Sequence, residues 1–227
     1  MKRFVAIIIL VVLGSGLLNT PISQASVTSP LDGVNVFSTA NDDIADLPDS
    51  PQARRAVAKQ LAIPSTSPIP LEGYRWPSRQ ITVYMATNDH QVRAAFRVAV
   101  KKWNQTKAIH LRWIKNRQRA DVIVTDSDLQ TTGNSDVGYV TSQLGSTETQ
   151  FNPDTHAMIR AKSTLDAAKL QYVNRQYRDH VAEHELGHAL GLAHAPEDYQ
   201  SVMIPRNIRG GISKYDRRAL RSLYGVY

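Results

Sequence analysis

The chain has 227 residues, 42% of them hydrophobic and 21% charged, which suits a globular protein with one domain and extensions around it. It contains no cysteine, so disulfide bonds are excluded and cysteine usage says nothing about the redox compartment. The formal net charge is +7, but no nucleic-acid-binding motif accompanies it, and we expect no nucleic-acid partner.

The positive charge is concentrated in one part of the chain. Residues 71–120 contain eleven Lys and Arg residues and two acids, whereas residues 121–159 contain six acids and neither Lys nor Arg. A basic face of this kind could attract an anionic cell surface or acidic substrates. The commoner explanation is the solvated side of a helix.

Residues 1–25 are typical of a secretory signal peptide. Lys2 and Arg3 supply the positive start, residues 4–13 form an unbroken apolar run, and Ser23-Gln24-Ala25 offers small residues for cleavage. An uncleaved membrane anchor is the alternative, but ten residues are short of the roughly twenty that a spanning helix needs. We therefore expect a secreted, extracellular protein with no transmembrane segment after removal of the signal.

Residues 26–70 form a low-complexity segment that is poor in large apolar side chains and rich in Ser, Thr, Pro and Asp. Such a segment cannot bury enough apolar surface to offset the entropy lost on ordering. Two roles are open, a removable pro-segment or a linker that tethers the protein to the cell surface. Residues 71–227 form the predicted folded domain.

The first half of this domain is predicted to run strand, helix, strand, strand. Apolar alternation indicates strands at residues 80–85 and 109–113, and an apolar run at 122–124 is typical of a strand covered on both faces. Between the first two strands, apolar residues recur at helical spacing as far as about Thr106, after a group of N-cap candidates at residues 87–89. Two large aromatic side chains of this helix are interpreted as core residues: Phe96 and Trp103.

The second half is predicted to contain two more strands and three helices. The strands lie at residues 137–142 and 156–161, with a loop over 144–155 between them. A short helix is expected near residues 165–172. A longer helix should begin between 174 and 179 and end at a glycine, Gly191. The last helix should begin at the capping box that Ser213 and Asp216 form.

The longer helix carries a motif that reads HELGHALGLAH. His184 and His188 are four residues apart, so on a helix they project from one face and could bind one metal ion. Glu185 borders the same face, where its carboxylate could take a proton from a metal-activated water. Gly191 can end the helix in a left-handed conformation, so that the chain turns back and His194 adds a third nitrogen. Three histidines leave the fourth position of tetrahedral zinc open, as catalytic zinc sites require.

The other histidines lack this context. His180 also lies four residues before His184 and could form a rival pair, but only the later pair has the glutamate, glycine and third histidine in place. His90, His110 and His156 have no partner signature, and we interpret them as structural or exposed.

With these residues in place, the motif resembles the zinc signature of the metzincin metallopeptidases. In that family a methionine in a tight turn lies beneath the zinc, shortly after the third histidine, and Met203 fits that place. Pro205 stands where astacin-like and serralysin-like members carry a tyrosine, so this turn resembles the matrixin-like branch, peptidase type M10. The final residues from Ser213 onward also resemble the last helix of matrixin catalytic domains.

The resemblance implies an α+β, metzincin-like zincin fold. It would have a twisted, mostly parallel sheet with an antiparallel edge strand, an active-site helix, and a small C-terminal subdomain ending in a helix. It implies one catalytic Zn²⁺ ion and a protein or peptide substrate that binds as an added strand along the edge strand. Gly138, Tyr139 and Val140 are the candidates for that contact.

Two features of matrixins are not expected here. The lack of cysteine excludes a cysteine-switch pro-segment. The region that holds structural zinc and calcium in matrixins lacks its His-rich pattern in this chain, so those sites are not carried over. Calcium binding to loop acids is an open alternative, with solvated acids the commoner explanation, and the acids concerned are Asp126, Asp128, Asp136 and Asp154.

The sequence therefore predicts a secreted zinc-dependent endopeptidase that hydrolyses peptide bonds through a zinc-activated water, with Glu185 as general base. Two alternatives stay open. One is a non-catalytic, zinc-stabilised protein of the cell surface. The other is a zinc amidase that acts on cell-wall peptide and would use the same residues.

Overall fold

The structure is a computed structural model. It describes the backbone of residues 4–13, 59–129, 131–134, 139–206, 208 and 210–226, and the side chains of these residues other than 4–13 and 131–142.

The described residues form strands and helices in mixed order. The strands are β1 (Phe4–Leu13), β2 (Gln80–Met85), β3 (His110–Trp113), β4 (Val122–Asp126), β5 (Thr131–Asn134), β6 (Tyr139–Asn152) and β7 (Ala157–Leu165). The helices are α2 (His90–Asn104), the 3-10 turn η2 (Arg117–Arg119), α3 (Ala167–Leu170), α4 (Arg175–Ala189) and α5 (Lys214–Leu223).

One mixed sheet organises the domain. Its strand order is β1-β6-β7-β4-β2-β3, and β5 pairs with β6 outside this path. β3, β2, β4 and β7 are parallel neighbours, whereas β6 runs antiparallel to β7 and β1 runs antiparallel to β6. The predicted α+β fold, with a mostly parallel sheet and an antiparallel strand, is confirmed. The antiparallel part is larger than the one edge strand that we predicted, because β1 and β5 also pair with β6.

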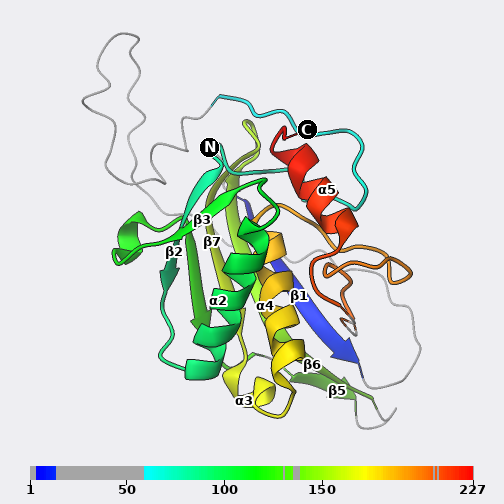
Figure 1. Ribbon diagram of the computed structural model, residues 1–227. Helices are drawn as coiled ribbons and strands as arrows, with labels where there is room; N and C mark the ends of the chain where they lie inside the picture. The colour runs from blue at the N-terminus through cyan, green and yellow to red at the C-terminus, as the bar shows by residue number, and fades with distance from the viewer. Residues whose placement is uncertain are drawn as a thin grey trace.

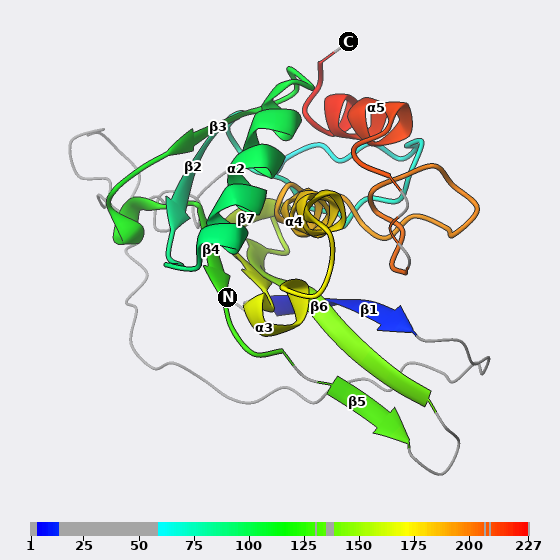
Figure 2. The same cartoon turned by 60° about the horizontal axis from the view of Figure 1, so that its bottom comes forward.

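The two long helices, α2 and α4, lie side by side against one face of the sheet (Figures 1 and 2). Phe96 and Trp103 of α2 are fully buried between the layers, as predicted. The indole nitrogen of Trp103 donates a hydrogen bond of 2.9 Å to the backbone oxygen of Glu183, so α2 is tied to α4 one residue before the motif begins. This contact fixes the motif helix within the core.

The ends of the later helices match the capping signals. Asn174 caps α4, which ends at Ala189, just before Gly191 with its positive φ of 96°. Both halves of the capping box at Ser213 and Asp216 are present at the start of α5. The short helix expected at 165–172 is confined to α3, Ala167–Leu170.

Strand β6 differs from its prediction. We expected a strand over 137–142 and a loop over 144–155, whereas β6 runs without interruption from Tyr139 to Asn152. This stretch is rich in Ser, Thr and Gln, and Thr147 and Thr149 are fully buried and hydrogen-bonded there. Tertiary partners for these hydroxyls make a strand out of a polar sequence.

The apolar run at residues 4–13 is strand β1, and it pairs with β6 along the length of that strand, with Leu10 opposite Gly145. Its removal as part of a signal peptide stays a prediction. Among the described residues, no helix is long and apolar enough to cross a membrane.

Part of the expected linker contacts the domain. The backbone N–H of Leu61 donates to the carbonyl of Thr155, and Ile69 is 1% exposed within the core. Residues 70–76 continue across the end of α4, where Leu71 forms a bridge with Leu192. The division of the chain at residue 70 stays a prediction.

Candidate metal centre

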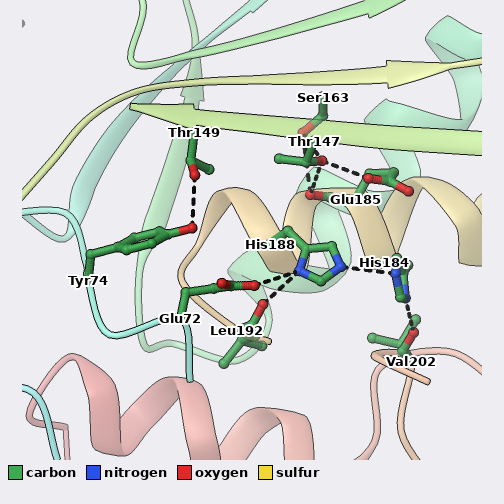
Figure 3. A network of polar contacts seen from close by, with 10 residues as sticks. All are labelled: Glu72, Tyr74, Thr147, Thr149, Ser163, His184, Glu185, His188, Leu192 and Val202. Atoms are coloured by element: carbon green, nitrogen blue, oxygen red, sulfur yellow. Dashed lines mark hydrogen bonds and ion pairs between the residues drawn. The ribbon is translucent and has the colours of Figure 1, made fainter. Parts of the chain in front are cut away.

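Helix α4 brings the first two histidines of the motif together. His184 and His188 are both fully buried, and their Nε2 atoms are 3.1 Å apart. The Nδ1–H of His184 donates to the carbonyl of Val202 at 2.7 Å, and that of His188 donates to the carbonyl of Leu192 at 2.9 Å (Figure 3). With both Nδ1 atoms occupied as donors, the Nε2 lone pairs of the two rings face each other, an arrangement that a shared cation stabilises.

Gly191 returns the chain to this pair. Its φ of +96° favours glycine, and a Cβ at this position would lie 2.5 Å from the carbonyl oxygen of Tyr74. The turn places His194 beside the others, so that one nitrogen from each of the three histidines lies within 4.8 Å of the rest.

The three side chains fit a zinc ion. The Nε2 atom of His194 is buried and has no hydrogen-bond partner among the described residues, so a metal is the ligand that would satisfy it. Burial, followed by the charges of the neighbouring histidines, lowers the pKa values of His184 and His188, and burial lowers that of His194. The rings are therefore neutral near pH 7, as metal ligands must be.

Glu185 is fully buried beside strand β6. Its Oε2 accepts a hydrogen bond of 2.7 Å from the hydroxyl of Thr147, and its Oε1 has no partner among the described residues (Figure 3). Burial raises the pKa of this carboxyl to about 8, against the opposing effect of the Thr147 hydrogen bond. A Cβ on Gly145 would lie 2.7 Å from Cγ of Glu185. The side chain of Glu185 fits here because residue 145 is a glycine.

Met203 packs under the motif helix. It is fully buried, and a Cβ on Gly187 would lie 3.1 Å from its methyl carbon and closer still to its sulfur. The turn is held by the buried carboxylate of Asp216, which accepts hydrogen bonds from the Val202 N–H and the Ser201 hydroxyl.

Glu72 is a second carboxylate at the centre, and sequence reasoning missed it. Its Oε1 lies 3.3 Å from Nδ1 of His188, and its side chain is 16% exposed (Figure 3). Burial raises the pKa of Glu72 to about 7, against the opposing effects of His194 and Tyr74. No local pattern could have identified it, because 116 residues separate it from His188.

The remaining histidines do not join this group. His180 is buried on α4 but lies next to Gly211, and His156 contacts the carbonyl of Gly73. Of the proposed calcium ligands, Asp136 lies outside the described residues. The other three belong to no cluster of potential ligands in the described part of the chain.

The predicted substrate contacts are only partly described. Gly138 lies outside the described residues, and the backbones of Tyr139 and Val140 pair with β5 at the start of β6. The residues of β6 that lie next to Glu185 are Gly145 and Thr147.

Comparison with known proteins identifies the family. The family model of the matrixins, peptidase family M10, matches residues 75–225. The chain belongs to the matrixin family. No curated protein sequence matches this matrixin.

Solved structures with some likeness to this matrixin are distant. A myroilysin structure is 13% identical, with a TM-score of 0.45, over 69% of this chain and 98% of the other. High choriolytic enzyme 1, a hatching enzyme zinc-protease from the medaka fish Oryzias latipes, is 12% identical, with a TM-score of 0.42, over 74% of this chain and all of the other (100%).

The resemblance to metzincins stated from the sequence is confirmed by the family match. As a matrixin, the chain is a zinc metalloendopeptidase, and zinc is the cofactor that the cluster of three histidines is suited to hold.

Proposed function

We propose that this matrixin cleaves peptide bonds at the centre formed by His184, His188 and His194, with Glu185 as general base. The observation that carries the proposal is the convergence of three buried imidazole nitrogens within 4.8 Å, one of them without a described partner. When bound, zinc supplies a Lewis acid that polarises a carbonyl and lowers the pKa of a coordinated water toward about 7.

Glu185 moves the proton in this mechanism. Its unpartnered Oε1 takes a proton from the attacking water and passes it to the leaving amine. Its other oxygen stays on the Thr147 hydroxyl, which limits the rotation of the carboxylate. The pKa of about 8 applies to the site without a metal ion, and the charge of a bound zinc ion would lower it, so that the carboxylate could accept a proton. The dry surroundings would then help the carboxyl to hold this proton midway through the reaction.

We propose that the substrate binds as an extended strand along β6, with Gly138, Tyr139 and Val140 among its backbone contacts. The pairing of β1 supports this, because β1 lies antiparallel along β6 from Thr141 to Phe151, directly after the candidate contacts, as an extended substrate would. Leu10 of β1 lies opposite Gly145, which adjoins Glu185. Removal of residues 1–25 would free this edge next to the general base.

We further propose that the protein is secreted through the signal peptide expected at residues 1–25. The secreted protein would carry exposed basic residues on α2, such as Arg97 and Lys101. They could attract the enzyme to an anionic cell surface over distances of about 10 Å at moderate salt.

The test is hydrolysis of a mixed peptide library by the zinc-loaded protein, with and without a chelator, beside the Glu185→Ala variant. The proposal expects cleavage that the chelator abolishes and that the variant lacks, while the variant retains zinc. Undiminished cleavage by Glu185→Ala would overturn it. Glu197→Ala, which removes an exposed carboxylate outside β6, is the matched control and should cleave like the wild type.

The alternatives predict different results in the same samples. A zinc-loaded protein that cleaves cell-wall peptide but no library peptide would be the amidase. A protein that binds zinc and cleaves neither substrate, both as the full chain and after removal of residues 1–25, would be the non-catalytic surface protein.

A further inference from the structure

We propose that Glu72 is a positioning residue of the metal centre, and that residues 70–74 form part of the metal-binding unit. The carboxylate would orient His188 and offset the charge of the bound ion. The inference rests on the proposed function, because it assumes that the three histidines bind zinc.

The first support is the position of the carboxylate. Glu72 Oε1 lies 3.3 Å from Nδ1 of His188, the nitrogen on the far side of the ring from the convergent Nε2 atoms. The same N–H already donates to the carbonyl of Leu192 at 2.9 Å, so the two acceptors share one proton. A carboxylate in this outer position orients a ligand imidazole and makes its metal-binding nitrogen more basic.

The second support is the backbone that carries Glu72. Its N–H donates to the carbonyl of Gly191 at 2.9 Å, and the N–H of Ala193 donates to the carbonyl of Pro70 at 3.0 Å. These bonds bracket the bridge between Leu71 and Leu192. Residues 70–72 are thus paired with the turn that connects the second and third histidines of the cluster.

Buried side chains hold both ends of this short segment in place. Ile69 is 1% exposed, and Tyr74 is 3% exposed and stacks on Phe151 with ring centroids 4.3 Å apart. The hydroxyl of Tyr74 is also hydrogen-bonded to Thr149 of β6 at 2.8 Å (Figure 3). The carboxylate of Glu72 is therefore presented to His188 from a fixed backbone.

The third support is charge. Three neutral imidazoles leave the two positive charges of a zinc ion without an anion in the ligand set. Glu72 is largely buried, and within the described part of the chain no Lys or Arg forms an ion pair with it. A buried carboxylate needs a cation nearby, and a metal ion at the histidine cluster would supply one.

The experiment is a zinc dissociation constant from chelator competition, measured on the full chain as produced, for the wild type and Glu72→Gln. The amide keeps the shape and an oxygen acceptor but loses the charge. We expect about 10- to 100-fold weaker zinc binding by Glu72→Gln, with unchanged thermal unfolding of the zinc-free protein. Glu72→Asp, which keeps the charge on a shorter arm, should fall between the two.

Two controls separate the possible failures. Glu148→Gln removes an exposed carboxylate paired with Lys162 and should leave zinc affinity unchanged. His188→Ala should bind zinc far more weakly than any of these variants. If His188→Ala loses zinc while folded Glu72→Gln and Glu72→Asp both bind it within twofold of the wild type, the inference about Glu72 is wrong and the proposed function stands. If His188→Ala binds zinc like the wild type, both are wrong.

Discussion

The hydroxyl of Thr147 lies 2.7 Å from the carboxylate of Glu185 and 2.9 Å from the backbone oxygen of the same residue. A residue in the middle of β6 therefore contacts both the side chain and the main chain of the proposed general base. A second hydroxyl, from Ser163 of β7, lies 3.1 Å from Thr147 and completes the group. The sheet thus limits the rotation of the carboxylate, and the motif helix alone could not do so.

Replacement of Thr147 by Val should lower kcat. Valine matches threonine in shape but cannot donate to Glu185, so the carboxylate loses its fixed orientation. We expect kcat to fall about tenfold, which corresponds to about 1.4 kcal/mol, with KM and zinc content unchanged. Steady-state kinetics with metal analysis test this, and Thr147→Ser should retain most of the activity. A Val variant as active as the wild type would contradict the role of Thr147.

Replacement of Gly145 by Ala should displace Glu185. The new Cβ would lie 2.7 Å from Cγ and 2.8 Å from Cδ of Glu185, within a fully buried site. The carboxylate must move, and we expect a loss of about 100-fold or more in kcat, since small misplacements of a catalytic group are costly. Zinc content should be preserved. Gly210→Ala is the control, because nothing lies within 4 Å of the Cβ position at residue 210. Normal activity of Gly145→Ala would contradict the prediction that its Cβ displaces Glu185.

Replacement of Asp216 by Asn should destabilise the turn that carries Met203. Asp216 is fully buried and accepts from the N–H groups of Ser213 at 2.7 Å and Val202 at 3.1 Å. Asparagine could keep its oxygen toward the two N–H groups, but its amide nitrogen would replace the oxygen that accepts from the Ser201 hydroxyl, and all three hydrogen bonds would lose their charged acceptor. We expect this to cost about 1.5–3 kcal/mol. Urea unfolding measures this, with the exposed Arg217→Gln change on the same helix as control. A change below about 0.5 kcal/mol would argue against the buried role of Asp216.

Removal of zinc should lower the melting temperature. The ion binds the folded centre and not the unfolded chain, so free zinc at 100 times its dissociation constant stabilises the fold by about 2.7 kcal/mol. Calorimetry with and without a chelator tests this. The melting temperature of His188→Ala should be the same with and without the chelator. If the melting temperature of the wild type also does not change, zinc binding does not stabilise the fold.

Stability should depend on the charge of Asp166 at acid pH. Burial acts to raise the pKa of Asp166, but hydrogen bonds from Leu129 and Lys169 and the charge of Lys169 outweigh it, so the pKa lies below its ordinary value of 3.8. A lowered pKa means that the carboxylate stabilises the fold above about pH 4 and that this contribution is lost as the pH falls below that value.

The measurement compares the wild type with Asp166→Ala at pH 7 and pH 3, with chelator present throughout. Asp166 caps α3, so the difference in unfolding free energy at pH 7 should be about 1–2 kcal/mol. It should shrink at pH 3. A difference that grows on acidification would contradict the direction of the shift.

The sequence by itself determined the features that depend on neighbours along the chain. Helical periodicity places His184 and His188 on one face whatever surrounds them, and the capping box at Ser213 starts α5 through contacts within one turn. The core positions of Phe96 and Trp103 followed from the same period. These local rules were enough to predict the histidine cluster, whereas the α+β fold was implied by the resemblance of the motif to the metzincin zinc signature.

Only the tertiary structure decided the rest. The polar stretch from Leu144 to Asn152 is a strand because distant groups satisfy its hydroxyls, Glu185 for Thr147 and Tyr74 for Thr149. Glu72 reaches His188 because a segment far earlier in the chain pairs with the turn at Gly191. The partners of a buried polar group are chosen by packing in three dimensions, and neither spacing nor composition along the chain records which ones they are.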